Sequence, residues 1–131
     1  MEIFSKRPLV MLDCAHNPQG IQQALCTVRS VLDTKFIVVF GVMADKDYSK
    51  MMDLLVPATQ VLIAVEAKTS RALKAKDILK EAKRRGMNAM EGPETWRGLD
   101  KAIRLASRTP WPILVIGSNY VTGEIIRKYE S

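Results

Sequence analysis

The sequence has few of the residues that mark several common classes of protein. Its 131 residues include two cysteines and one histidine, and aromatic residues make up 6% of the chain. Two cysteines are too few for a disulfide framework, and neither has metal-ligating neighbours at the usual spacing. We therefore expect Cys14 and Cys26 to be free thiols, and we expect no metal site built by this chain.

Long apolar runs are also missing. No segment approaches the roughly 20 apolar residues that cross a membrane, and the start of the chain lacks the apolar segment of a signal peptide. These absences predict a cytoplasmic protein without a membrane partner. The length, with 47% hydrophobic and 26% charged residues, fits a single globular domain over residues 1–131.

The charge of the chain is positive but dispersed. The net charge is +6 at pH 7, and lysines and arginines occur along most of the sequence. Surfaces that bind nucleic acid usually combine clustered basic residues with aromatic ones, which are scarce here. We therefore expect no nucleic-acid partner. A positive surface suits small anionic substrates such as nucleotides and carboxylates, whose approach it accelerates.

Phosphate-binding loops of the common kinds are absent as well. The chain contains neither a Gly-x-x-x-x-Gly-Lys-Ser/Thr loop nor a Gly-x-Gly-x-x-Gly turn. It therefore has no recognised means of holding a triphosphate or a dinucleotide by itself.

Short apolar segments alternate with amphipathic segments along the chain. Uninterrupted apolar runs predict strands that are buried on both faces, and the first two strands are close enough to form a hairpin. The predicted strands span residues 3–4, 9–12, 36–40, 61–65, 113–116 and, more weakly, 87–90.

Helices are predicted where apolar residues recur at intervals of three and four. Asn17 is a suitable cap for the first helix and Pro18 a suitable first residue, whereas Gly86 is expected to end the third helix in a left-handed conformation. The predicted helices span residues 18–32, 48–55, 74–85, 96–106 and 124–129. This alternation predicts an α/β fold, with a mostly parallel sheet covered by helices on both faces; the hairpin would add one antiparallel edge strand.

Three polar segments follow predicted strands, and in an open α/β sheet ligands bind beyond the carboxyl ends of the strands. These segments are 13–17, 41–47 and 117–120. In the first, Asp13 can accept hydrogen bonds from a sugar, and His16 can bind a carboxylate or transfer a proton. Equally, Asp13 and Asn17 can simply close the turn and cap the helix.

Lys46, Ser118 and Arg71 each have two interpretations as well. Lys46 can present a cation to an anionic group, or it can belong to a solvated Asp-Lys-Asp turn. Ser118 can bind a carboxylate together with backbone donors, or it can serve only as a helix cap. Arg71, beyond the strand at 61–65, is equally ambiguous, and spacing alone does not decide among these roles.

Three motifs at strand ends give a more specific indication. They are Leu-Asp-Cys-Ala-His-Asn-Pro at 12–18, Phe-Gly-Val-Met-Ala-Asp-Lys-Asp at 40–47 and Gly-Ser-Asn-Tyr-Val-Thr-Gly-Glu at 117–124. In this order and spacing they resemble the carboxyl-terminal domain of folylpolyglutamate synthase/dihydrofolate synthase, within the Mur ligase superfamily. The resemblance covers essentially the whole chain and implies a three-layer, Rossmann-like fold.

The resemblance also implies an ATP-dependent amide ligase. Such an enzyme phosphorylates a substrate carboxylate with ATP and Mg²⁺, and the amino group of L-glutamate then attacks the acyl phosphate to form an amide on a folate or pteroate. In that family the phosphate loop and the metal ligands lie mostly in a preceding ATPase domain, which this chain lacks. The isolated chain is therefore expected to be inactive and to need that domain as its partner.

Particular positions receive roles from the same resemblance, and none of them acts as a catalytic nucleophile. Asp13 is expected to contact the nucleotide, at its ribose, with Asn17 nearby. The residues expected to hold the glutamate carboxylates are His16, Lys46 and Ser118. Further candidates for the site are Arg71, Asp47 and Tyr120.

Three departures and two alternatives accompany this interpretation. The family usually has glycine where this chain has Cys14, and often leucine where it has Asn119. The Gly-Arg that the family places before the first strand is missing. We therefore expect Met1 to be internal to a longer protein, or the chain to be a truncated product. One alternative is another Mur-type ligase, acting on a cell-wall precursor or on cyanophycin. The other is a stand-alone nucleotide-binding or regulatory module. The Asp-x-Ala-His-Asn-Pro form favours the folate branch.

Overall fold

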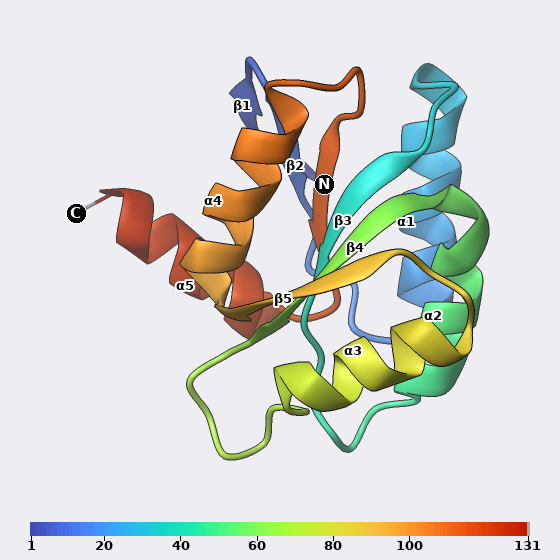
Figure 1. Cartoon of the computed structure of the whole chain (residues 1–131), viewed down its shortest axis with the longest axis vertical. Coiled ribbons are helices and arrows are strands. Elements are labelled where there is room, and N and C mark those ends of the chain that lie inside the picture. The colour runs from blue at the N-terminus through green and yellow to red at the C-terminus, as the bar shows by residue number, and fades with distance from the viewer. Residues whose placement is uncertain (131) are drawn as a thin grey trace.

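The computed structural model describes residues 1–130, which form a central sheet between two layers of helices (Figure 1). The strands are β1 (Glu2–Lys6), β2 (Leu9–Leu12), β3 (Phe36–Phe40), β4 (Thr59–Glu66), β5 (Ala89–Glu94) and β6 (Ile113–Ile116). Across the described part of the chain their order in the sheet is β1-β2-β6-β3-β4-β5. Among the six strands of the described chain, β1 and β2 form the one antiparallel pair, which confirms the predicted antiparallel edge strand.

Helices cover both faces of the sheet, as predicted. They are α1 (Pro18–Val31), α2 (Tyr48–Leu55), α3 (Ala75–Arg84), α4 (Thr95–Ala106) and α5 (Asn119–Glu130), with a short 3₁₀ turn, η1 (Val56–Ala58), after α2. The first three helices pack on one face, and α4 and α5 pack on the other (Figure 1). The α/β fold class expected from the sequence is therefore confirmed.

The two cores meet at the central strands, where successive side chains point to opposite faces. In β3, Val38 and Phe40 face α1, α2 and α3, whereas Ile37 and Val39 face α4 and α5. Every residue of β3 is fully buried. This burial on both faces explains why the strand is an uninterrupted apolar run rather than an alternating one.

Helix ends follow the predicted local chemistry. Pro18 is the first residue of α1, and the side chain of Asn17 accepts a hydrogen bond of 2.7 Å from the backbone N–H of Gly20. Gly86 follows α3 with φ of +72°, the left-handed conformation that glycine adopts without strain. Cys14 and Cys26 are free and exposed, as expected.

The boundaries of two elements differ from prediction. Strand β5 runs to Glu94, beyond the predicted 87–90, because it is an edge strand in which Pro93 need not donate a ladder hydrogen bond. Helix α5 begins at Asn119 rather than 124, since Ser118 caps it. Trp96, at the start of α4, is half-buried, and its indole N–H donates to Glu94.

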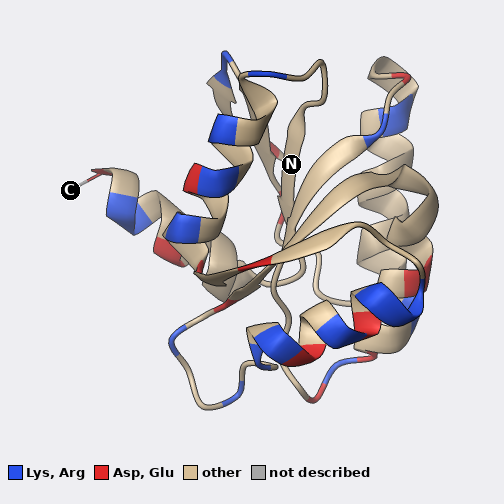
Figure 2. Ribbon diagram, viewed as in Figure 1, with Lys and Arg blue, Asp and Glu red and all other residues tan. Residues whose placement is uncertain are grey.

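Basic residues occur on helices of both faces and are dense on α3 (Figure 2). Among residues 1–130, no helix has the length and apolar character needed to cross a membrane.

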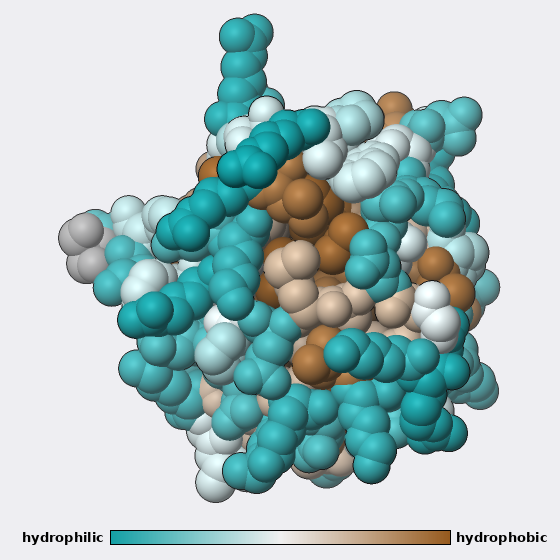
Figure 3. Space-filling model, in the orientation of Figure 1, coloured by the Kyte–Doolittle hydropathy of each residue, from teal (hydrophilic) through white to brown (hydrophobic). Residues whose placement is uncertain are grey.

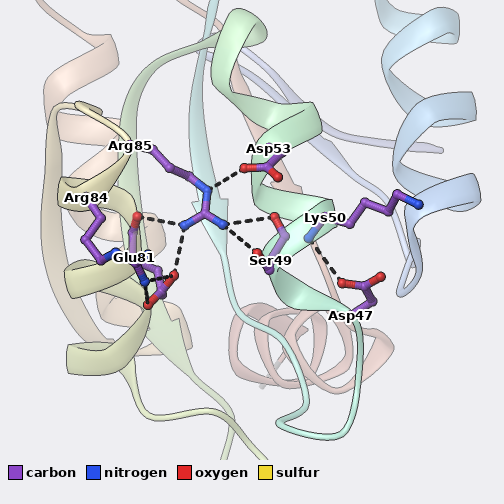
Figure 4. Close-up of polar contacts among 7 residues, drawn as sticks. All are labelled: Asp47, Ser49, Lys50, Asp53, Glu81, Arg84 and Arg85. Atoms are coloured by element: carbon purple, nitrogen blue, oxygen red, sulfur yellow. Dashed lines mark hydrogen bonds and ion pairs between the residues drawn. The ribbon is translucent and has the colours of Figure 1, made fainter.

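A cluster of charged and polar groups fastens α2 to α3 (Figure 4). The guanidinium of Arg85, with its side chain 14% exposed, donates to Asp53 Oδ1 at 2.8 Å, Ser49 Oγ at 2.8 Å and Glu81 Oε1 at 3.0 Å. Burial opposes the charged form of Arg85, but its hydrogen bonds to the two carboxylates outweigh burial and raise its pKa. The hydrogen bond from Arg85 holds the pKa of Glu81 below its usual range.

This cluster predicts a defined dependence of stability on pH. Since the folded state lowers the pKa of Glu81, its ionised carboxylate contributes stability above the unfolded value of 4.5, and that contribution disappears as the pH falls through the lowered folded value. We expect Glu81→Gln to reduce the free energy of unfolding by about 1 kcal/mol at pH 7 and by much less at pH 3.

Urea denaturation of both proteins at several pH values measures this difference. Glu2→Gln, at an exposed position of β1, is the matched control and should have little effect at either pH. A destabilisation by Glu81→Gln that stays constant from pH 7 to pH 3 would show that the carboxylate contributes no charge-dependent stability.

Candidate functional site

The order of the strands brings three polar loops to one edge of the sheet. Strand β6 lies between β2 and β3, and all three run parallel. The helices that follow β2 and β3 pass to one face, whereas α5, which follows β6, passes to the other. Adjacent strands whose connections diverge in this way leave a crevice beyond their carboxyl ends, where open α/β sheets bind ligands. We refer to the loops 13–17, 41–47 and 117–120 at this edge as the rim.

The first rim loop is held by its own side chains. Asp13 Oδ1 accepts a 2.8 Å hydrogen bond from the N–H of Ala15, which closes the turn after β2, while Asp13 Oδ2 lies 3.5 Å from the amino group of Met1. The carbonyl of Ala15 accepts from the N–H of Gly117 at 3.1 Å, which joins this loop to the loop after β6. Both of the local roles considered for Asp13 and Asn17, closing the turn and capping α1, are therefore realised.

His16 and Asn17 nevertheless keep functional atoms free at the surface. The His16 ring is exposed, and its Nδ1 lies 3.2 Å from the carbonyl of Cys14. A carbonyl oxygen can only accept, so Nδ1 carries the proton and Nε2 of the neutral ring is an acceptor. In Asn17 the Oδ1 atom is used by the cap, but the NH₂ group retains its donors.

The loop after β6 begins with two buried residues, Gly117 and Ser118. Ser118 is 1% exposed, and its Oγ accepts a 3.0 Å hydrogen bond from the N–H of Tyr120, which caps α5. The hydroxyl still has one proton to donate. Gly117 has φ of +120°, and a Cβ there would lie 2.2 Å from the carbonyl oxygen of Gly41. The loops after β3 and β6 therefore touch along their backbones.

The loop after β3 leaves the ammonium group of Lys46 without an acidic partner among the described residues. Asp47 caps α2 by accepting from the N–H of Lys50 at 3.2 Å. Asp45 lies 3.6 Å from the guanidinium of Arg71 instead. Because both neighbouring aspartates interact elsewhere, the half-buried Lys46 is not neutralised by the Asp-Lys-Asp sequence in which it stands.

Arg71 connects a fourth loop, 67–74 after β4, to the rim. Its guanidinium carbon lies 5.9 Å from the centre of the Tyr120 ring as well as near Asp45. The backbone holds the same arrangement, since the N–H of Ala44 donates to the carbonyl of Arg71 at 2.8 Å. Arg71 and Tyr120 are both exposed, so this contact is weak and the guanidinium can move to a ligand.

Sequence reasoning missed one residue that organises this edge. Glu124 of α5 accepts from the N–H of Lys68 at 2.6 Å and from the hydroxyl of Thr95 at 2.8 Å. It thereby fastens α5 to the loop after β4 and to the start of α4. The last residue of the motif at 117–124 is this glutamate, which was a signal that it could have a specific partner.

Residues 1–130 contain no group of three or more His, Cys, Asp or Glu side chains that could hold a metal ion. The rim instead offers a carboxylate, an imidazole, an unpaired ammonium and several N–H and O–H donors. This set suits an anionic or zwitterionic ligand held by hydrogen bonds and charge.

Comparison with known proteins gives this geometry a context. The family model of the Mur ligase, glutamate ligase domain matches residues 1–119. The folylpolyglutamate synthase of Lacticaseibacillus casei is 31% identical over 127 residues, which is 95% of this chain and 28% of that protein. A shorter match, 46% over 43 residues, covers 33% of this chain and 8% of a UDP-N-acetylmuramoyl-L-alanyl-D-glutamate--2,6-diaminopimelate ligase of Prochlorococcus marinus.

A solved structure shares the whole fold. Folylpolyglutamate synthase of Mycobacterium tuberculosis, complexed with ADP and AMPPCP, superposes with a TM-score of 0.86 and 26% identity over 98% of this chain and 31% of that one. The chain thus spans less than a third of the length of these relatives.

Proposed function

The chain belongs to the Mur ligase family, as a glutamate ligase domain, and on this basis we propose that it is the carboxyl-terminal domain of an ATP-dependent ligase that joins L-glutamate to a folate or pteroate. Its part is to bind glutamate and one side of the nucleotide. The likeness to folylpolyglutamate synthases over nearly the whole chain supports the folate assignment. The contact of three polar loops at the carboxyl end of β6 is the observation that carries the proposal.

The proposed reaction has two steps. A carboxylate of the acceptor attacks the γ-phosphorus of ATP, which releases ADP and leaves an acyl phosphate. The amino group of glutamate then attacks the acyl carbon, loses a proton and expels inorganic phosphate, so that an amide forms. ATP, accompanied by Mg²⁺, supplies the activation, so this domain needs no nucleophile. Its contribution is to position the amine, which is the main demand of such a step.

On the nucleotide side we assign Asp13 and Asn17. The Oδ2 atom of Asp13 accepts hydrogen bonds from ribose hydroxyls, and the NH₂ group of Asn17 donates nearby. The turn after β2 holds both side chains rigidly, because Asp13 Oδ1 and Asn17 Oδ1 already accept backbone N–H groups. Ligand binding uses the NH₂ group of Asn17, which the local structure leaves free, and Asp13 Oδ2, which must exchange its contact with the amino group of Met1, 3.5 Å away, for the ribose.

On the glutamate side we assign Lys46, Ser118 and His16. The unpaired ammonium of Lys46 binds a carboxylate, and the remaining hydroxyl proton of Ser118 donates once a small movement of the loop uncovers it. Nε2 of neutral His16 accepts from the substrate's amino group, whereas only the protonated ring donates to a carboxylate. Arg71, Asp47 and Tyr120 are the further candidates around these residues.

Asn17 provides a way to separate its structural role from its ligand role. Asn17→Ser keeps a capping oxygen but removes the NH₂ group, whereas Asn17→Ala removes both. We expect Asn17→Ala to reduce the free energy of unfolding by about 1 kcal/mol and Asn17→Ser to change it little. In the intact ligase both variants should raise KM for ATP several-fold. A normal KM for ATP with Asn17→Ser would leave Asn17 with only its capping role.

The acceptor is tested with the complete product of the reading frame that encodes this chain. Purified protein is assayed for ATP- and glutamate-dependent ligation onto dihydropteroate, folates and cell-wall precursors. We expect product with dihydropteroate or folate and none with the cell-wall precursor. Ligation to the cell-wall precursor alone would support the second candidate, a peptidoglycan ligase, which the short match to the Prochlorococcus enzyme favours.

The isolated 131-residue chain should not hydrolyse ATP when L-glutamate and folate are present, because it has no phosphate loop. Release of inorganic phosphate measures this, with the complete protein as the positive control. Turnover by the isolated chain would contradict the assignment of the phosphate site to another domain. Absence of ligation by the complete protein, with nucleotide binding retained, would support a regulatory module instead.

A further inference from the structure

Helix α3 has a basic face that the proposed site does not use. Its buried side consists of Ala75, Ile78 and Ala82. Glu81 points toward Arg85 and the α2 cluster (Figure 4). The remaining side forms a shallow depression of about 510 Å³, which we call the α3 basic surface, lined by Lys76, Leu79, Lys80, Lys83 and Arg84.

The charges of this surface are of one sign and largely unpaired. No acidic residue lines the depression. Arg84 binds Glu81 at 2.8 Å, but none of the lysines forms an ion pair or side-chain hydrogen bond with another residue of the 1–130 segment. Lys76, Lys80 and Lys83 are all exposed. In Figure 3 the surface over α3 is mostly hydrophilic, which is consistent with a solvated, positively charged face.

The lysines are arranged as a row that leads away from the rim. Helical geometry places Lys80 about 6 Å, and Lys83 about 10 Å, along the axis from Lys76. The helix begins directly after the loop that carries Arg71, which contacts Tyr120 and Asp45 at the rim. A flexible chain with one end at the rim can therefore extend along α3 (Figures 1 and 2).

We propose that the α3 basic surface binds an acidic oligopeptide, namely an oligoglutamate chain that would form on the acceptor if the proposed ligation is repeated. This inference rests on the proposed function, because the glutamate ligase is what would bring such a chain to the rim. Repeated carboxylates match a row of ammonium groups. Nucleic acid is a poorer match, because single strands are usually held by aromatic stacking and no aromatic residue lines the depression.

Direct binding to the 131-residue chain tests the inference without any need for catalysis. Fluorescein-labelled oligoglutamates of one, three and six residues are titrated with the chain at low ionic strength, and anisotropy is recorded. We expect affinity to rise with each added glutamate and to fall steeply with salt. The triple variant Lys76→Gln, Lys80→Gln, Lys83→Gln should weaken binding of the hexamer about tenfold.

The control variant also removes three positive charges, but from the end of the sheet opposite to the rim, near the amino ends of the parallel strands. Lys6→Gln, Lys35→Gln and Arg108→Gln together change three exposed positions and should leave affinity within about twofold. Urea midpoints confirm that both triple variants fold.

Three results would overturn the inference. They are equal binding of one and six glutamates, equal losses in the two triple variants, and tighter binding of a hexathymidylate than of the hexaglutamate. Since no ligation is involved, any of them leaves the proposed ligase function standing.

Discussion

Gly117→Ala is expected to lower the free energy of unfolding by about 3 kcal/mol or more, because two independent costs coincide at this position. Gly117 has φ of +120°, a conformation that side-chain-bearing residues rarely adopt. An added Cβ would also lie 2.2 Å from the carbonyl oxygen of Gly41 and 2.9 Å from the ring of Phe40. Neither the buried backbone directly after β3 nor the fully buried ring of Phe40 can move away without disturbing the core.

Gly86→Ala is the matched control for this prediction. Gly86 also has a positive φ, +72°, but a Cβ there would meet no atom within 4 Å. We therefore expect it to cost only about 1 kcal/mol, from backbone strain. Urea denaturation of both variants gives the comparison. Equal and small losses would show that the approach of the loops after β3 and β6 is not tight.

The same substitution bears on the site. The N–H of Gly117 donates to the carbonyl of Ala15, so displacement of Gly117 moves the loop that carries Asp13 and His16. A Gly117→Ala protein that remains folded should therefore lose affinity for nucleotide and glutamate together.

If the proposed function holds, Lys46→Gln in the complete protein is expected to raise KM for L-glutamate by about 30-fold or more, because a hydrogen bond between charged groups contributes about 2–3 kcal/mol. The ammonium has no acidic partner among the described residues, since Asp45 pairs with Arg71 and Asp47 caps α2. Its charge is therefore available for a substrate carboxylate. KM for ATP and the stability of the fold should change little.

Lys50→Gln supplies the control. Lys50 stands four residues further on, is exposed, and contributes only its backbone N–H to the cap of α2. The KM for glutamate of the Lys50→Gln protein should stay within twofold of the wild-type value. An unchanged KM for glutamate in Lys46→Gln would assign Lys46 to the solvated turn that the sequence also allowed.

Much of the fold was predictable because local patterns determine it. Uninterrupted apolar runs such as 36–40 mark strands buried on both faces, and Asn17 with Pro18 marks a helix start. The position of β5 was harder to predict, because its polar residues and Pro93 lack a strand pattern and become a strand only through pairing with β4. Tertiary contact, rather than propensity, decides such an edge.

The site was predictable only in outline. Polar residues that follow strands indicated the rim, and the strand order then brought the loops together. Local spacing could not show that Asp45 turns to Arg71 and leaves Lys46 unpaired, or that Ser118 is buried. Those facts depend on contacts between residues far apart in sequence. The role of Glu124 depends on the same kind of contact.

The central claim is that the loops after β2, β3 and β6 form one binding site for glutamate. The most direct test is a titration of the ¹⁵N-labelled chain with L-glutamate to tens of millimolar, followed by two-dimensional NMR, with L-lysine as a control for ionic strength. The account predicts that the largest glutamate-specific shifts fall on amides of 13–17, 43–47 and 117–120 together. Shifts confined to one loop, centred elsewhere, or equally produced by L-lysine would contradict it.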